Sequence, residues 1–287
     1  TCPAVAGGGL ELRAAAMGGN ALSVARLGEL AAIDLGLNLV GWAAAASLQT
    51  EKFYDILGSL TYWILILRAR GMAASTAGEA GMSTRQQICS LCVLLWAGRL
   101  GSMLVQRAHK YGDRRFDKVK TDPKKFLLYW TVQAVWCFLT ALPVYIQLSQ
   151  ERRDTEPLGW SDYASWLGWL AGMTLEVVAD RQKSAFKDAG NTSFIDVGLW
   201  RYSQHPNYFG EMFLWASLSL SCLNSFGAAV FPKLVALCSP AFVFYMLRYV
   251  SGVPLLQKMS LQKFGKDAAY NAYRARTSLL VPWFPRP

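Results

Sequence analysis

The sequence predicts an all-helical membrane protein, a bundle of about seven transmembrane helices, and three observations support this. Of the 287 residues, 53% are hydrophobic and 17% are charged, whereas soluble domains carry about 25% charged residues. The segments 126–150 and 212–232 contain no charged residue, and about 20 apolar residues are enough to cross a bilayer as a helix. The basic residues gather between the apolar segments. Together these features argue against a soluble fold.

Apolar runs predict seven helices along the chain, of which the second and the fifth are the shortest. They are expected at 30–48, 53–67, 86–106, 126–148, 163–180, 208–226 and 231–250. Residues 30–287 are expected to form a single membrane domain. Residues 1–29 are rich in Ala and Gly and include Arg13 and Arg26, so we expect an N-terminal tail or the remnant of a processed targeting segment.

Lys and Arg concentrate in the segments 107–125, 181–206 and 251–287. With seven spans these segments lie on one side of the membrane, which the positive-inside rule assigns to the cytosol, stroma or matrix. The expected location is therefore the endoplasmic reticulum or an organelle membrane, mitochondrial or plastid. Such a basic face contacts lipid headgroups or holds an anionic cofactor, and composition leaves both open. Nucleic-acid binding is not expected.

Ionisable residues inside the expected spans are costly and are candidates for function. They are Asp34, Asp55, Arg99, Glu176, Asp180, Glu211 and Arg248. Glu176 and Asp180 are four residues apart and share one helix face. Glu211 and Arg248 are expected at the same depth, which predicts a polar pocket open to the basic side. The alternative is that these acids pair with Arg99 or Arg248 to hold helices together.

The cysteines and histidines predict no metal site. Five of the six cysteines fall inside apolar helices. Cys89-x-x-Cys92 has the spacing of a redox motif but lacks the βαβ context of one, so buried cysteines acting as small apolar side chains are expected. The two histidines, His109 and His205, are too few and too distant to form a metal centre.

The segment "RYSQHPNYFGE" (201–211) is a polar cluster that leads directly into an uncharged run. Pro206 suits the first turn of a helix, which places His205 at the cap and Asn207 in the first turn. The free N–H groups of such a turn attract anions. Tyr202 and Tyr208 suit stacking on a ring. A capped helix with interfacial aromatic residues is an equally good interpretation of composition alone.

The longer segment "GLWRYSQHPNYFGE" (198–211) resembles the signature of the DUF1295 family of membrane proteins. That family is related to the C-terminal domain of the steroid 5α-reductases, and more distantly to the isoprenylcysteine carboxyl methyltransferases. The resemblance covers roughly 95–286. Further segments resemble the family in the same order, at 95–117, 126–144, 175–187 and 270–285.

The resemblance implies a membrane reductase with NADPH in a pocket between the C-terminal helices. The cofactor-contacting positions that it implies are Glu176, Asp180, Lys187, Tyr202, His205, Asn207, Glu211, Arg274 and Arg276. No GxGxxG motif in a strand–helix context is present, so basic side chains and helix N-termini would hold the phosphates.

Hydride transfer to an enone needs a donor that polarises the carbonyl. In the steroid reductases a glutamate and a tyrosine of the N-terminal half serve this purpose. This sequence has no match to that glutamate motif, and Tyr54 and Tyr62 are the weak substitutes that it offers as catalytic residues.

The expected function is therefore NADPH-dependent reduction of a double bond in a lipid-soluble substrate of steroid, isoprenoid or fatty-acyl type. One alternative is a catalytically silent subunit that assembles with other membrane proteins. A second is a methyltransferase that uses S-adenosylmethionine and shares the His-Pro-x-Tyr-x-Gly pattern. Against the second, the segment 255–265 lacks the acidic pair of that branch, and Glu211 favours the reductases.

Overall fold

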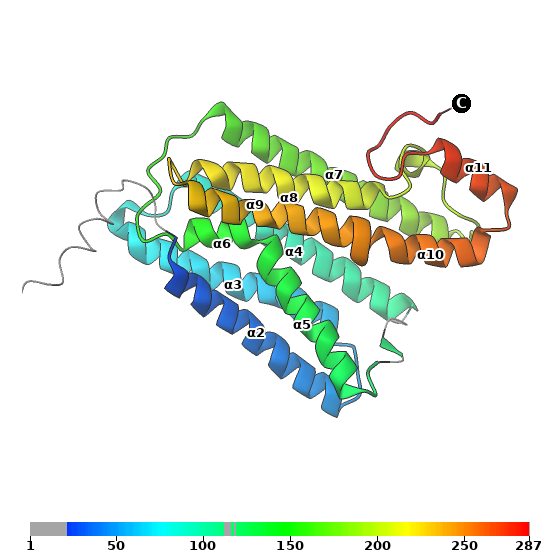
Figure 1. Ribbon diagram of the computed structural model, residues 1–287, viewed down its shortest axis with the longest axis horizontal. Helices are drawn as coiled ribbons and strands as arrows, with labels where there is room; N and C mark the ends of the chain where they lie inside the picture. Colours follow the sequence, from blue (N-terminus) through cyan, green and yellow to red (C-terminus); the bar gives the residue numbers. More distant parts are fainter. Residues whose placement is uncertain (1–21, 112–115, 118, 287) are drawn as a thin grey trace, which may run out of the picture.

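The computed structural model describes residues 22–111, 116–117 and 119–286, and these form an elongated bundle of helices (Figure 1). The helices are α2 (Val24–Ser47), α3 (Tyr54–Ala77), α4 (Thr84–Tyr111), α5 (Pro123–Thr140), α6 (Leu142–Leu148), α7 (Trp160–Asp188), α8 (Pro206–Asn224), α9 (Val230–Tyr245), α10 (Val253–Phe264) and α11 (Ala268–Arg276). The π-helical turn η4 (Met246–Val250) joins α9 to α10. Apart from one isolated β-bridge, between Ser203 and Ser278, the regular structure of these residues is helical, which confirms the predicted fold class.

A helix lies at each of the seven expected places, with different boundaries. The first begins at Val24, and residues 1–21 of the expected tail lie outside the described residues. Helices α3 and α7 extend to Ala77 and Asp188, well past their expected ends. The expected helix 126–148 is two helices, α5 and α6, bent by 57°. Pro143 in the first turn of α6 explains the break, because proline lacks the N–H that would continue α5.

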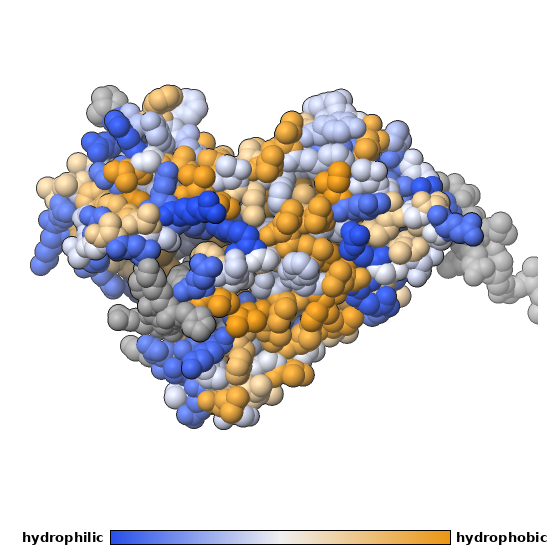
Figure 2. Space-filling view, turned by 180° about the vertical axis from the view of Figure 1, so that it is seen from behind, coloured by the Kyte–Doolittle hydropathy of each residue, from blue (hydrophilic) through white to orange (hydrophobic). Residues whose placement is uncertain are grey.

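The membrane character is confirmed, but the count of seven spans is not. Among the described residues, three segments are long and apolar enough to cross a bilayer, 24–47, 84–106 and 230–264, and the bent pair α5 and α6 makes a fourth if it counts as one span. Polar residues interrupt the other long helices, such as the acids and lysines of α7. On the face in Figure 2, apolar side chains form a broad band across the middle, and hydrophilic side chains gather toward both ends.

Helices α7 and α8 make the most extensive helix contact among the described residues, and glycines allow it. A Cβ atom on Gly172 would lie 2.7 Å from the backbone oxygen of Gly210, and one on Gly210 would lie 2.7 Å from the oxygen of Gly172. Small residues that let two backbones approach are typical of packing between membrane helices. Because Gly172 lies one turn before Glu176 on α7, this crossing sets the distance between α7 and the start of α8.

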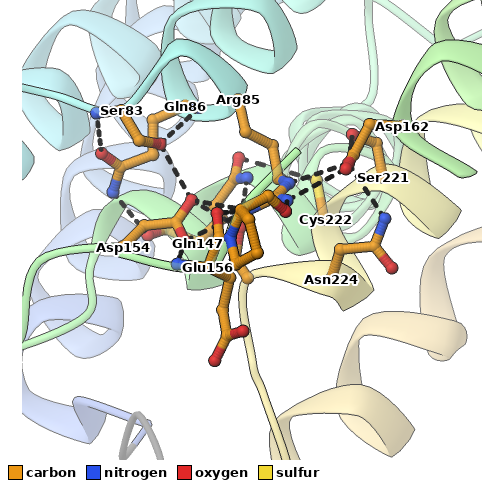
Figure 3. A network of polar contacts seen from close by, with 12 residues as sticks. Ser83, Arg85, Gln86, Gln147, Asp154, Glu156, Asp162, Ser221, Cys222 and Asn224 are labelled. Carbon is orange, nitrogen blue, oxygen red and sulfur yellow. Dashed lines mark hydrogen bonds and ion pairs between the residues drawn. The ribbon is translucent and has the colours of Figure 1, made fainter. Parts of the chain in front are cut away.

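At one end of the bundle a buried arginine joins the starts of α4 and α7 (Figure 3). The Arg85 guanidinium donates to both carboxylate oxygens of Asp162, at 2.8 and 2.9 Å, and to those of Asp154 at 3.1 Å. It also donates to the backbone oxygens of Glu156 and Pro157. The three charged side chains are at most 2% exposed. Arg85 lies between the expected helices 53–67 and 86–106, so sequence reasoning did not identify it as a buried charge.

Candidate functional site

Helices α4, α7 and α8 bring four polar side chains together in what we call the acid cluster, made of Arg99, Glu176, Asp180 and Asn207. The guanidinium of Arg99 forms ion pairs with the carboxylates of both Glu176 and Asp180. The amide nitrogen of Asn207 donates to Asp180 at 3.1 Å. The predicted shared face of Glu176 and Asp180 is therefore confirmed, and so is the alternative that Arg99 binds them.

The local sequence explains this meeting. The cap geometry predicted for the start of α8 is confirmed, since His205 is the N-cap and Pro206 stands in the first turn. Asn207 therefore projects from the first turn of α8. The close glycine crossing brings that turn against α7, where Asp180 is located. Asn207 Oδ1 is buried and has no hydrogen-bond partner among the described residues.

Aromatic side chains continue the acid cluster toward the bundle interior. The indole N–H of Trp96 donates to Glu176 at 3.2 Å. The Trp96 ring packs edge-on against the ring of Tyr62, with centroids 5.4 Å apart. The hydroxyl of Tyr62 shares a hydrogen bond of 2.6 Å with Thr140. Glu211 is half-buried, and its carboxyl group is close enough to interact electrostatically with both Tyr62 and Glu176.

Tyr62 and Tyr54 both line a cavity of about 300 Å³ between α3, α4 and α5, which we call the aromatic cavity. Trp136, Leu100 and Leu104 give it a largely apolar wall. The Tyr54 hydroxyl donates to the backbone oxygen of Tyr129 at 2.9 Å. The two candidate catalytic tyrosines therefore lie on one cavity, and only Tyr62 connects it to the acid cluster through Trp96.

A second cavity, of about 500 Å³, lies between the end of α7 and the C-terminal helices α10 and α11. We call it the basic cavity, because its charged lining is made of Lys183, Lys187 and Lys263. It adjoins the acid cluster: Lys183 is one turn beyond Asp180 on α7, and His205 is two residues before Asn207. Aromatic side chains complete the wall, namely Phe186, Phe194, Trp200, Phe264, Tyr270 and Tyr273.

His205 is the buried polar group of the basic cavity. Its side chain is 7% exposed and stacks on the ring of Tyr208, and its Nδ1 atom has no partner among the described residues. Burial, together with the smaller effect of the positive charges of Lys183 and Arg248, lowers the pKa of His205 to about 4. The imidazole is therefore neutral at pH 7 and offers a hydrogen bond to a ligand rather than a charge.

Of the nine predicted cofactor positions, two line the basic cavity, Lys187 and His205, and three lie away from both that cavity and the acid cluster. Tyr202 packs edge-on against Phe284 in the C-terminal segment. Arg274 and Arg276 line a neighbouring cavity that shares Gln204 with the basic one. Arg248 stacks over the ring of Tyr249, and its charge reaches His205. The structure brings the remaining positions together in two groups. Glu176, Asp180, Asn207 and Glu211 lie at or beside the acid cluster, and Lys187 and His205 line the basic cavity.

Sequence reasoning missed three contributors. Trp96 stands three residues before Arg99 on α4, so both reach α7 from one helix face, but tryptophan in an apolar run carries no signal of a polar contact. Lys183 continues the helix face of Glu176 and Asp180 but was not predicted to line a cavity, and Lys263 belongs to a basic segment that the sequence treated as a topology signal. Four of the five described cysteines are buried, Cys89 and Cys92 among them, as expected for small apolar side chains.

Two comparisons with known proteins found a match. An uncharacterised protein of Schizosaccharomyces pombe is 25% identical to this chain over 234 residues, which cover 71% of this chain and 64% of the relative. No solved structure matches the chain. A family model described as a protein of unknown function, DUF1295, matches residues 41–277, which include the acid cluster, the aromatic cavity and the start of α8. This chain belongs to the DUF1295 family.

Proposed function

We propose that this protein is a membrane-embedded reductase that uses NADPH to reduce a double bond in a lipid-soluble substrate. The observation that carries the proposal is the arrangement of two cavities around one polar cluster. The basic cavity suits an anionic cofactor, the aromatic cavity suits an apolar substrate, and Trp96 and Glu176 lie between them. Perturbed and buried polar groups beside a cavity are typical of a binding site.

The residues of the basic cavity fit a phosphate-bearing dinucleotide. Three lysine side chains supply positive charge for phosphate oxygens. His205 Nδ1 in this cavity and Asn207 Oδ1 in the adjoining acid cluster are buried and unpartnered among the described residues, so both are hydrogen-bonding groups that a ligand would satisfy. Lys183 is held over the ring of Trp200, with its nitrogen 4.9 Å from the ring centroid. A volume of about 500 Å³ lies within the range of about 300–1,000 Å³ that ligand pockets have.

NADPH, when bound, supplies a hydride. The residues of this chain would orient the substrate and supply a hydrogen-bond donor to its carbonyl oxygen. Tyr62 is the best placed candidate, because its hydroxyl lies at the aromatic cavity and Thr140 orients it. Glu211 lies near Tyr62 and acts on it electrostatically, so we assign Glu211 the role of a carboxyl group that influences the Tyr62 hydroxyl. The substrate class follows from the apolar wall: a steroid-like, isoprenoid or fatty-acyl chain.

A silent subunit of a larger membrane assembly is a second candidate, and one observation favours it. Arg99 already satisfies Glu176 and Asp180 within the protein, so the acid cluster is complete as a structural contact between α4 and α7. A protein in which this cluster only joins helices needs no ligand there.

Calorimetry with detergent-purified protein separates these functions. We expect NADPH to bind, and Lys263→Gln and Asn207→Ala to weaken binding at least about tenfold, because each removes about 1.4 kcal/mol or more of charge-assisted or buried hydrogen bonding. Lys258→Gln is the matched control: it removes the same charge from the same helix, but Lys258 does not line the cavity. Binding of S-adenosylmethionine instead would point to methyl transfer. Absence of binding by either ligand would favour the silent subunit.

A further inference from the structure

Four arginines surround two adjoining cavities formed by the C-terminal segment, and we call this region the arginine cleft. Arg276 and Arg286 line both cavities, which have volumes of about 500 and 390 Å³. Arg274 lines the larger cavity and Arg201 the smaller one. Figure 1 shows the segment after α11 turning back from that helix over the bundle.

Backbone hydrogen bonds fix the cleft, so its arginines are held close together by the fold. The N–H of Arg286 donates to the oxygen of Arg276 at 2.9 Å. The N–H of Gln204 donates to the oxygen of Ser278 at 2.8 Å, and that of Trp283 to the oxygen of Tyr202 at 3.0 Å. The segment 276–286 is therefore fastened both to itself and to the residues before α8.

The positive charge of the cleft is largely uncompensated. None of the four arginines forms an ion pair with another described residue. Asp196 is the one acidic side chain among the described residues that line the two cavities. The Nε atom of Arg274 is buried without a hydrogen-bond partner. Like charges held side by side repel each other, and an anion with several oxygen atoms would relieve this and satisfy the free N–H groups.

Large apolar side chains of the same segment point to the source of that anion. Trp283 is 69% exposed and Phe284 is 75% exposed, and both line the larger cavity beside Arg286. Val281, at 54% exposed, lies next to them. A soluble ligand does not need exposed tryptophan and phenylalanine, whereas the interface of a bilayer accommodates such rings next to basic side chains.

We infer that the arginine cleft binds the phosphate-bearing headgroup of an anionic phospholipid, with Trp283 and Phe284 inserted at the membrane interface. The guanidinium groups of Arg276 and Arg286 bind the phosphate oxygens, and Arg274 completes the contact through Nε. This site is separate from the basic cavity, and it does not depend on whether the protein reduces a substrate.

Thermal unfolding of delipidated protein in a zwitterionic detergent tests this inference. We expect phosphatidylglycerol to raise the Tm of the wild type by about 5 °C, as a ligand in large excess over its Kd does, and phosphatidylcholine to have little effect. Arg276→Gln/Arg286→Gln should lose the shift. Both side chains are exposed, so the variant should fold. Lys258→Gln/Lys266→Gln, also exposed, is the matched control and should keep the shift.

Parallel Tm measurements distinguish whether the bound phosphate group comes from a lipid or from a soluble ligand. NADP⁺ and inorganic phosphate replace the lipid, and native mass spectrometry counts the lipids that each variant retains. A shift with phosphatidylglycerol that both double variants keep would overturn the inference, because it would report general charge attraction. A shift that NADP⁺ or inorganic phosphate produces through Arg276 and Arg286, without lipid, would also overturn it and assign the cleft to a soluble ligand.

Discussion

At the scale of single residues, the acid cluster depends on one hydrogen bond that can be isolated. Trp96 and Trp215 are both buried and pack against each other, with centroids 4.9 Å apart. Of these two tryptophans, only Trp96 donates to Glu176, and the indole nitrogen of Trp215 has no partner among the described residues. Replacement of either by phenylalanine removes a similar volume. The difference between the two variants therefore measures the hydrogen bond.

We predict that Trp96→Phe lowers the free energy of unfolding by about 1 kcal/mol more than Trp215→Phe does, because a bond to a carboxylate is lost. Unfolding in mixed micelles, followed by circular dichroism, provides the measurement. Equal losses in the two variants would show that Trp96 contributes packing alone.

His205 gives the protein a predictable response to acid. Its pKa of about 4 in the folded protein lies below the value of about 6.5 in an unfolded chain. The folded state therefore binds fewer protons, and stability falls as the pH decreases from about 6.5 to 4. The full shift corresponds to roughly 3 kcal/mol.

The measurement is the Tm between pH 7.5 and 4.5 for the wild type and for His205→Gln, which cannot titrate. We expect the Tm of the wild type to fall more steeply below pH 6.5. Parallel curves would mean that the imidazole is not held neutral by its surroundings.

At the scale of helices, the approach of α7 and α8 positions the site. An added Cβ on Gly172 would lie 2.7 Å from backbone atoms of both Gly210 and Leu214, which cannot move as a side chain can. Gly36 on α2 has no atom within 4 Å of such a Cβ. We predict that Gly172→Ala destabilises the protein by about 1–3 kcal/mol, while Gly36→Ala is neutral or stabilising by up to about 1 kcal/mol.

Thermal unfolding compares the two alanine variants, and NADPH calorimetry on Gly172→Ala shows whether the altered crossing also displaces Asn207 from Asp180. A Gly172→Ala variant as stable as the wild type would show that the helices can separate at little cost.

The same helices show what the sequence could and could not predict. The spacing of Glu176 and Asp180 and the chemistry of Pro206 are local, so their shared face and the cap were predictable. Arg99 was named as one of two possible partners, but its choice over Arg248 depends on how α4 lies beside α7. Arg85 was missed because its two carboxylates lie some 70 residues away in the chain, and no local pattern marks such a contact.

At the scale of the whole molecule, the charge pattern predicted that the basic segments share one region. It did not predict that their lysines and arginines line different cavities. The lysines of α7 and α10 line the basic cavity, whereas the arginines of the C-terminal segment form their own cleft. That separation results from the turn of the chain after α11, where backbone hydrogen bonds tie it to residues 202–204. A family resemblance that grouped Lys187 with Arg274 and Arg276 therefore combined residues that the fold places in two cavities.

The residues that we expect to stabilise the bundle and those that we expect to bind the cofactor lie at different ends of α7. Asp162, a partner of Arg85, and Lys183, in the basic cavity, are about 30 Å apart on α7 at 1.5 Å per residue. Arg85→Met leaves Asp154 and Asp162 buried without their cation, which costs about 3–5 kcal/mol. We predict that this variant has a much lower Tm but, at temperatures where it is folded, binds NADPH with unchanged affinity.

Lys263→Gln should show the reverse, with unchanged Tm and weakened binding. Adding Asp154→Asn and Asp162→Asn to Arg85→Met should recover part of the lost stability, because the neutral amides no longer require a buried cation. If Arg85→Met instead weakened NADPH binding in proportion to its loss of stability, the two ends of the bundle would be coupled, and the basic cavity would depend on the packing of α7 along its whole length.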